Sequence, residues 1–281
     1  MISDSIYLIL IFGLWGLITN TIAWKKGFYH WQLFPVTPIA FKHVASVFGI
    51  YLGFTYVLAG YLGVLLQRYG GASPSLNLII LLQSLLILSM VITLFVYCRT
   101  FAKGVFTKVW KNTGQLVPTS PLFDFCLGVT AWFIAFPVVQ VVGQFFDLIL
   151  FLFFNLETYE QVAVRYLKTA LQSPFLTMLA LTSIVIVAPI VEEFLFRGTL
   201  QTYLKRSFTK KTAIILSSMC FALFHFSTQQ GFGNLSLIPS LFVFSCFLGY
   251  IYERQGSLYA SIGLHMAFNF ASGIRILLSP E

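Results

Sequence analysis

Residues 76–97 read LNLIILLQSLLILSMVITLFVY, a stretch without a single charged side chain. At 1.5 Å of rise per helical residue it is about 33 Å long, which matches the hydrocarbon thickness of a bilayer. Similar apolar runs recur along the chain, in which 58% of the 281 residues are hydrophobic and 9% are charged. An ordinary soluble domain has about 25% charged residues. The chain is therefore predicted to be an integral membrane protein.

The sequence predicts an all-α polytopic membrane protein with about eight transmembrane helices in a single membrane domain, 1–281. The fourth apolar run is long, continues from Leu122 to Phe154 and contains Asp147. Its tail at 147–154 is interpreted either as an interfacial or re-entrant piece or as part of one long tilted helix. The N-terminus lacks a basic leader region, so we expect it to be retained as the first helix. The expected spans are 5–24, 44–66, 76–97, 124–147, 175–197, 212–229, 236–252 and 257–277.

The formal charge of +8 comes from Lys and Arg residues in short loops between apolar spans, and these do not form one long patch. This pattern indicates membrane topology and argues against a nucleic-acid partner. If the spans alternate, twelve of the cations lie on one side and only Arg68, Arg165, Lys168 and Arg275 lie on the other. The positive-inside rule then places both termini outside and the basic loops in the cytoplasm. The twelve are Lys25, Lys26, Lys42, Arg99, Lys103, Lys108, Lys111, Lys205, Arg206, Lys210, Lys211 and Arg254.

Ionisable residues inside the expected spans gather in the C-terminal half of the chain. Each costs at least about 2.5 to 3.5 kcal/mol to insert, so each needs a partner or a function. The four cysteines show no CxxC or Cys/His ligand spacing and are interpreted as small apolar residues. Apart from Asp147, the ionisable residues well inside the spans are Glu192, Glu193, Arg197, His225 and His265, the last with Asn269 one turn further on.

The run APIVEEFLFRG at 188–198 carries two adjacent acids and a base. Glu193 and Arg197 are four residues apart with the acid first, which favours an ion pair on one helix face. Glu192 is rotated by about 100° from its neighbour and is a candidate general base in a polar cavity. Pro189 is expected to kink this helix, and Gly198 to end it. The alternative is a structural cluster of one Arg and two acids that holds helices together.

Two later helices supply the other candidates. His225 follows Phe221 by one turn, and His265 precedes Asn269 by one turn. The pair of imidazole and amide suits the stabilisation of an oxyanion, although a hydrogen-bonded clamp between helices is an equal alternative. A carboxylate, two imidazoles and an amide can activate water and stabilise a tetrahedral intermediate, which indicates hydrolysis of an amide. GxSxG, HExxH and paired membrane Asp residues are absent from the sequence.

The strings EEFLFRG at 192–198, FALFH at 221–225 and HMAFN at 265–269 resemble the EExxxR, FxxxH and HxxxN motifs of the CAAX prenyl endopeptidase and bacteriocin-processing family of intramembrane proteases. The resemblance covers 175–277, the expected catalytic helices, and implies an eight-helix core with a cavity open to the cytosol. It implies that Glu192 and His225 polarise the attacking water and that His265 and Asn269 hold the oxyanion. Glu193, Arg197 and Phe221 would support the site.

The resemblance leaves metal dependence open. Glu192, His225 and His265 could bind zinc, which accepts nitrogen and oxygen ligands. We favour a water activated without metal, because Asn269 is a poor zinc ligand and is better explained as an oxyanion donor.

The family implies a protein or peptide substrate at the lipid bilayer. Some members act on prenylated proteins, and bacterial members are linked to peptide maturation, bacteriocin self-immunity and regulation of sensor proteins. The missing targeting peptide and the small size favour a bacterial inner membrane. A non-enzymatic membrane scaffold or immunity protein is the alternative. A transporter is disfavoured, because the two halves of the chain do not repeat the polar pattern.

Overall fold

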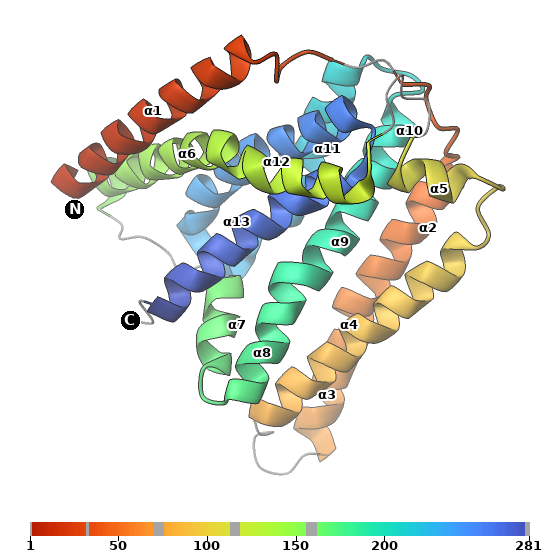
Figure 1. Cartoon of the computed structure of the whole chain (residues 1–281). Coiled ribbons are helices and arrows are strands. Elements are labelled where there is room, and N and C mark those ends of the chain that lie inside the picture. The colour runs from red at the N-terminus through yellow and green to blue at the C-terminus, as the bar shows by residue number, and fades with distance from the viewer. Residues whose placement is uncertain (1, 32–33, 70–75, 113–118, 156–161, 279–281) are drawn as a thin grey trace.

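A computed structural model describes residues 2–31, 34–69, 76–112, 119–155 and 162–278, and these residues are almost entirely helical (Figure 1). Within these ranges the only β pairing is an isolated bridge between Lys111 and Ser257. The all-α fold class is therefore confirmed. The elements are α1 (Ile2–Lys25), α2 (Phe41–Leu52), η1 (Gly53–Leu58), α3 (Ala59–Tyr69), α4 (Leu76–Cys98), α5 (Val105–Trp110), α6 (Pro121–Phe154), α7 (Val162–Ala170), α8 (Pro174–Thr182), η2 (Ser183–Val187), α9 (Ala188–Glu193), η3 (Phe194–Gln201), α10 (Thr202–Leu204), α11 (Lys210–Phe224), η4 (Thr228–Gly233), α12 (Asn234–Gln255) and α13 (Leu258–Leu278).

Seven helical stretches in the described part of the chain are long and apolar enough to cross a membrane. The helix expected at 212–229 is α11, which has 15 residues and is therefore only about 22 Å long. It ends at Phe224 because His225 leaves the helical conformation, with φ −91° and ψ 1°. The seven stretches are Ile2–Lys25, Phe41–Leu66, Leu78–Cys98, Pro121–Phe154, Pro174–Leu204, Thr228–Gln255 and Leu258–Leu278.

The long apolar run after Leu122 forms one helix, α6, without a break at Asp147. Its 34 residues extend over about 51 Å, so it exceeds the roughly 30 Å of a hydrocarbon core. Trp15 of α1 packs edge to face on Trp132 of α6, with ring centroids 5.8 Å apart. Figure 1 shows this pair of helices crossing obliquely to α2, α4 and α8. The long tilted helix is therefore the alternative that the structure favours for 147–154.

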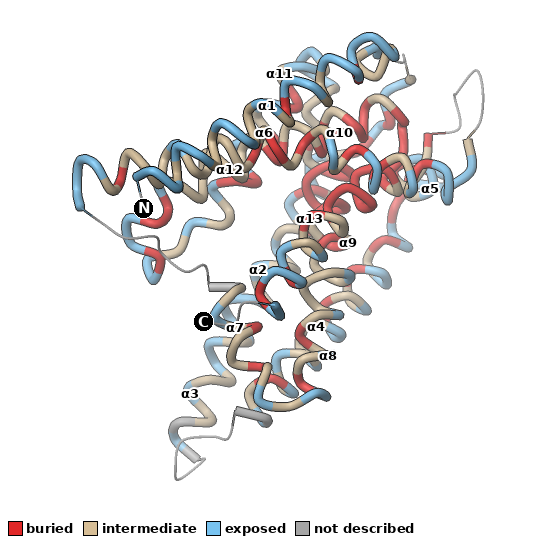
Figure 2. Tube along the Cα trace, turned by 60° about the vertical axis from the view of Figure 1, so that its left-hand side comes forward, coloured by how far each residue is buried: buried red, intermediate tan, exposed pale blue. Residues whose placement is uncertain are grey.

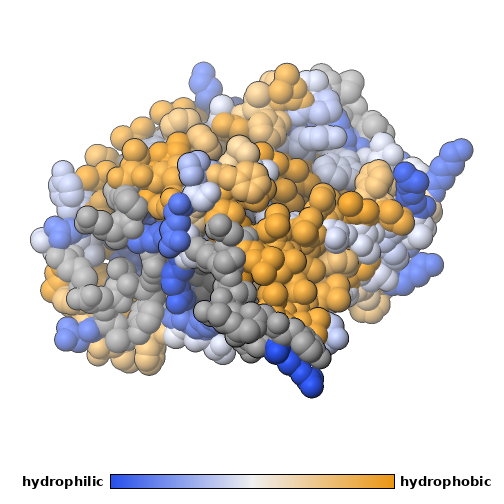
Figure 3. Space-filling view, turned by 90° about the horizontal axis from the view of Figure 1, so that it is seen from below, coloured by the Kyte–Doolittle hydropathy of each residue, from blue (hydrophilic) through white to orange (hydrophobic). Residues whose placement is uncertain are grey.

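The outer surface is apolar and the buried residues lie deep between the C-terminal helices. Large apolar side chains such as Leu10, Phe95 and Phe153 are exposed. Figure 3 shows such side chains over much of one face. In Figure 2 the buried residues gather around α9, α10 and α13. This arrangement suits a protein whose solvent is lipid and whose polar residues lie inside.

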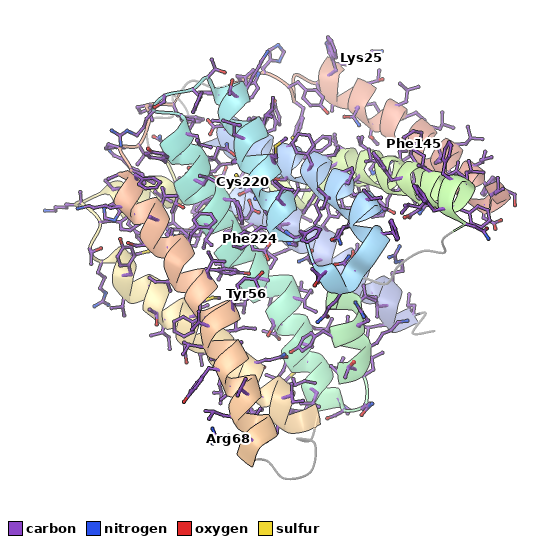
Figure 4. All side chains as sticks on the ribbon, turned by 180° about the vertical axis from the view of Figure 1, so that it is seen from behind. Lys25, Tyr56, Arg68, Phe145, Cys220 and Phe224 are labelled. Atoms are coloured by element: carbon purple, nitrogen blue, oxygen red, sulfur yellow. The ribbon has the colours of Figure 1, made fainter. Side chains whose placement is uncertain are left out.

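The basic segments meet at one end of the molecule. Arg254 donates to the carbonyl oxygen of Phe28 over 2.7 Å, and Arg206 donates to that of Ile39 over 2.8 Å. Asn112, which follows the basic segment 99–111, donates its backbone N–H to the carbonyl oxygen of Gly256 over 2.7 Å. Lys25 and Arg68 lie at opposite ends in Figure 4. The fold thus brings these basic segments together at the end opposite to Arg68, and which end faces the cytoplasm stays a prediction.

We expect single cysteines at positions 211 and 165, in a chain whose four native cysteines are replaced by Ala, to be labelled from opposite sides of sealed vesicles. Both native residues, Lys211 and Arg165, are exposed. A membrane-impermeant maleimide should reach position 211 only from the cytoplasmic side. Labelling of position 211 from outside would reverse the topology.

Helices α6 and α13 touch through two glycines. A Cβ on Gly128 would lie 2.0 Å from the carbonyl oxygen of Ala260, and one on Gly263 would lie 2.3 Å from that of Phe125. Side chains larger than hydrogen are therefore excluded at both positions, as in other close helix crossings in membranes. This contact places His265, two residues after Gly263, against the centre of the molecule.

Gly263→Ala should lower stability by about 1 to 3 kcal/mol or more, because backbone atoms must separate to admit the methyl group. The melting temperature of the protein in detergent measures the effect. Gly13→Ala is the matched control, since nothing lies within 4 Å of a Cβ at Gly13 in α1. Equal melting temperatures for the two variants would contradict the close contact.

Candidate active site

The acidic pair lies in the middle of one continuous helical rod, from α8 through η2, α9 and η3 to α10. Two parts of the rod, Ser183–Val187 and Phe194–Gln201, are π-helical. The first of these ends two residues before Pro189, whose ring would clash with a carbonyl in a regular α-helix. The helix thus accommodates Pro189, where a kink was predicted, next to a widened, π-helical turn. Turns of this kind are frequent at functional sites.

Gly198 does not end this rod, contrary to the prediction. The helix continues to Leu204, and Gly198 has no left-handed conformation. A Cβ at this position would lie 2.8 Å from Cγ1 of Val109. The glycine is required for close packing against α5 and not for a helix stop.

Glu193 and Arg197 form the predicted ion pair. The Nη1 atom of Arg197 lies 3.1 Å from Oε1 of Glu193, and both side chains are buried. The guanidinium also donates to the hydroxyl of Ser245 over 2.7 Å, and it lies 4.7 Å from the centre of the Phe221 ring. The cation is thus held by α9, α11 and α12 together.

His265 is fixed by the same carboxylate. Its Nδ1 lies 2.9 Å from Oε1 of Glu193, and its ring packs edge to face on Phe244 with centroids 5.2 Å apart. A carboxylate paired with Arg197 can only accept, so Nδ1 must donate. In the neutral imidazole the Nε2 atom then carries a lone pair.

His225 is held in the same tautomer by a different acceptor. It caps the end of α11, and its Nδ1 donates to the carbonyl oxygen of Phe221 over 2.8 Å. A backbone carbonyl only accepts, so the Nε2 atom of the neutral ring carries a lone pair here too. The φ and ψ of His225 lie in the bridge region, in which many active-site residues are found.

The two Nε2 atoms face one oxygen of Glu192. Each lies 3.8 Å from Oε2 of Glu192, whose side chain is 15% exposed, while that of His225 is 32% exposed. Glu192, His225 and His265 therefore converge from three helical elements. All three facing atoms are hydrogen-bond acceptors, and 3.8 Å is too long for a direct bond between them. A water between them could donate its two hydrogens to two of these acceptors.

Asn269 lies one turn beyond His265 on α13, but its side chain bonds to a different helical segment. Its Nδ2 donates to the carbonyl oxygen of Ile184 in η2 over 2.8 Å. The predicted alternative of a clamp between helices is thus present. An amide has two N–H groups, so one remains for another acceptor.

The three converging residues match zinc in kind but not in spacing. Zinc binds imidazole nitrogen and carboxylate oxygen at about 2.0 to 2.2 Å, which puts neighbouring tetrahedral ligands about 3.4 Å apart. The separations here are 3.8 Å. Among the described residues no group of three or more His, Cys, Asp or Glu is arranged to hold a metal ion.

Several contributing residues were not predicted. Ser245 and Phe244 lie in an apolar span, 236–252, that has no Asp, Glu, Lys, Arg or His side chain. The serine, a small polar side chain among large apolar ones, was the available signal. Tyr51 and Phe224, whose ring centroids lie 5.4 Å apart, bring α2 to the end of α11 beside His225. Figure 4 shows these elements from behind, with Phe224 labelled on α11 and Tyr56 on the adjoining η1. Aromatic residues are too common in this chain for either ring to stand out in the sequence.

Residues 174–271 match the family model described as type II CAAX prenyl endopeptidase Rce1-like. No curated protein and no solved structure matches the chain. The matched range contains all three motif strings and nearly coincides with 175–277, so the resemblance is confirmed for this region. The family implies protease activity on a protein substrate, and the apolar helices imply a multi-pass protein in a lipid bilayer. Over residues 174–271 this membrane protein is thus similar to the Rce1-like type II CAAX prenyl endopeptidases, which are CAAX-type intramembrane proteases.

Proposed function

We propose that this chain is an intramembrane endopeptidase that hydrolyses a peptide bond near the membrane with a water held by Glu192, His225 and His265. The observation that carries the proposal is the convergence of three acceptors, with each Nε2 3.8 Å from Oε2 of Glu192. A water supplies the two donors that this arrangement lacks. Its oxygen is then oriented by contacts that leave a lone pair free for attack.

Glu192 acts as the general base. As the water oxygen bonds to the carbonyl carbon of the substrate, one water proton moves to the Glu192 carboxylate. The carbonyl oxygen becomes an oxyanion in a tetrahedral intermediate. The protonated Glu192 then gives its proton to the amine, and the C–N bond breaks. His225 keeps the water in place through its Nε2 lone pair.

The oxyanion needs donors, and two groups are assigned to it. Asn269 keeps one N–H after the bond to Ile184. Because its Nδ1–H points to Glu193, His265 donates from Nε2 only when its ring has taken up a proton from solvent before the attack. Glu192 and His225 then accept the two hydrogens of the water. The Glu193 carboxylate stabilises such an imidazolium, as the buried Asp does in a catalytic triad. Donors of this type typically contribute about 3 kcal/mol of transition-state stabilisation each.

The proposal also includes a class of substrate and a location in the cell. We assign the chain to a bacterial inner membrane and its substrate to proteins with a cleavable C-terminal or membrane-proximal segment, lipidated in the CAAX-type case. The test uses the purified full chain in detergent with a farnesylated Cys-Ala-Ala-Met peptide and the same peptide without lipid, followed by mass spectrometry. Cleavage of the farnesylated peptide alone supports a CAAX-type substrate. Cleavage of both supports the peptidase without a lipid requirement.

The alternative function is a non-enzymatic membrane scaffold or self-immunity protein. The bonds of Arg197 to Ser245 and of Asn269 to Ile184 favour it, because they crosslink helices whatever the chemistry. Glu192 and His225 do not fit a scaffold, because they make no direct hydrogen bond to each other that would hold their helices together. Folded protein that leaves both peptides intact would favour the scaffold. A chelator arm separates the mechanisms: the metal-free proposal expects unchanged turnover, and loss that added zinc restores would overturn it.

A further inference from the structure

We infer that Asn269, besides the N–H assigned to the oxyanion, has a second, positioning role: it replaces the backbone N–H missing at Pro189 and thereby fixes the helix segment that carries Glu192. The inference rests on the proposed function only in taking Glu192 as the base. The replacement itself follows from the backbone of η2 and from one hydrogen bond.

The missing donor follows from the register of the π-helical turn. At the end of η2 the N–H of Ala188 donates to the carbonyl oxygen of Ser183, five residues earlier. In the same register the next carbonyl, that of Ile184, would accept from residue 189. That residue is Pro189, which has no N–H. The turn therefore leaves the Ile184 carbonyl without its helical donor.

Asn269 supplies that donor from another helix. Its Nδ2 lies 2.8 Å from the carbonyl oxygen of Ile184, across a sequence separation of 85 residues. Lipid offers no donor that could take over this bond, so loss of the Asn269 amide leaves the Ile184 carbonyl without its protein partner. The side chain thus acts as part of the hydrogen-bond ladder of η2.

Helix α13 makes a second hydrogen bond to the rod. One turn before Asn269, His265 of α13 bonds to Glu193 over 2.9 Å. Glu192 lies between Ile184 and Glu193 in sequence, so α13 holds the rod on both sides of the proposed base. Loss of the Asn269 bond would free one of the two attachments and let Oε2 of Glu192 move relative to the imidazoles.

The test is a double-mutant cycle between Pro189→Ala and Asn269→Ala in the full chain. Asn269→Ala should lower the melting temperature by about 2 to 8 °C and peptide turnover up to about 100-fold. With Pro189→Ala present, the new N–H can satisfy Ile184, so Asn269→Ala should cost less than half as much in melting temperature. Turnover of the double variant should exceed that of Asn269→Ala, a rescue that a general packing role would not produce.

Pro137→Ala is the matched control, because Pro137 also lies inside a membrane helix but in α6. Its effect should add to that of Asn269→Ala without rescue. Additive losses in the Pro189 cycle would overturn the inference, as would a double variant that fails to fold. The proposed function fails separately, if Glu192→Gln retains turnover while the melting cycle still shows the coupling.

Discussion

Glu192→Gln should yield a folded protein whose peptide turnover is lower by about 10² to 10⁴, the range expected for loss of a general base. Gln has the shape of Glu but cannot take the proton of water. It also places either an N–H or a weaker acceptor 3.8 Å from the two imidazoles, where the proposed water requires a carboxylate. Turnover of a cleaved peptide by purified protein, at matched monomer yield from detergent, measures the effect.

The melting temperature is the control for this variant. The Glu192 side chain is 15% exposed, and its contacts with the two His rings, at 3.8 Å, are too long to be direct hydrogen bonds. Its replacement should therefore leave the melting temperature within about 2 °C of the native value. Near-native turnover by a folded Glu192→Gln protein would remove the peptidase mechanism proposed for this site.

Glu193→Gln should behave in the opposite way, with a loss of about 3 to 5 kcal/mol of stability, as is typical of a broken buried ion pair. One oxygen of Glu193 bonds both Arg197, at 3.1 Å, and His265, at 2.9 Å. The neutral amide would leave the guanidinium buried without its counter-charge and would release the ring. The yield of detergent-stable monomer and the melting temperature measure this loss.

A paired replacement separates charge loss from shape loss. Glu193→Gln with Arg197→Met removes both charges and should recover part of the stability lost in Glu193→Gln alone, because no buried ion remains unpaired. Turnover should stay low, since His265 lacks its carboxylate in both proteins. A stable but inactive Glu193→Gln protein, together with an active Glu192→Gln protein, would exchange the two roles.

Features that depend on composition and on helix spacing could be predicted from the sequence. The length of apolar runs predicts the spans, because the bilayer sets a minimum helix length. The spacing of four residues predicts the pair of Glu193 and Arg197, since it follows from helix geometry alone. The scarcity of charges in the first three spans identified the C-terminal half as the location of the site, and Glu192, His225 and His265 converge there in the structure.

Features that depend on tertiary contacts could not be predicted. Glycine is common at helix ends, which led to the prediction of a stop at Gly198. Its observed role is to allow close packing against Val109 of α5, which is distant in sequence. The end of α11 at Phe224 depends on the conformation of His225, which no apolar pattern encodes. The acceptor of Asn269 was likewise hidden, because a π-helical turn leaves no clear mark in the order of residues.

Because of the π-helical turn η2, residues that are equivalent in this rod and in a related chain need not have the same spacing in sequence. A turn of this kind accommodates one residue more than an α-helical turn over the same path, so a relative without it would carry a single-residue gap near 183–187. A sequence alignment without gaps would then shift the acidic pair of such a relative by one position relative to Glu192 and Glu193. Deleting one residue from η2 should likewise turn Glu192 by about 100° relative to α8, while α13 still holds Glu193. Tolerance of insertions and deletions should thus be far lower in this rod than its apolar composition suggests.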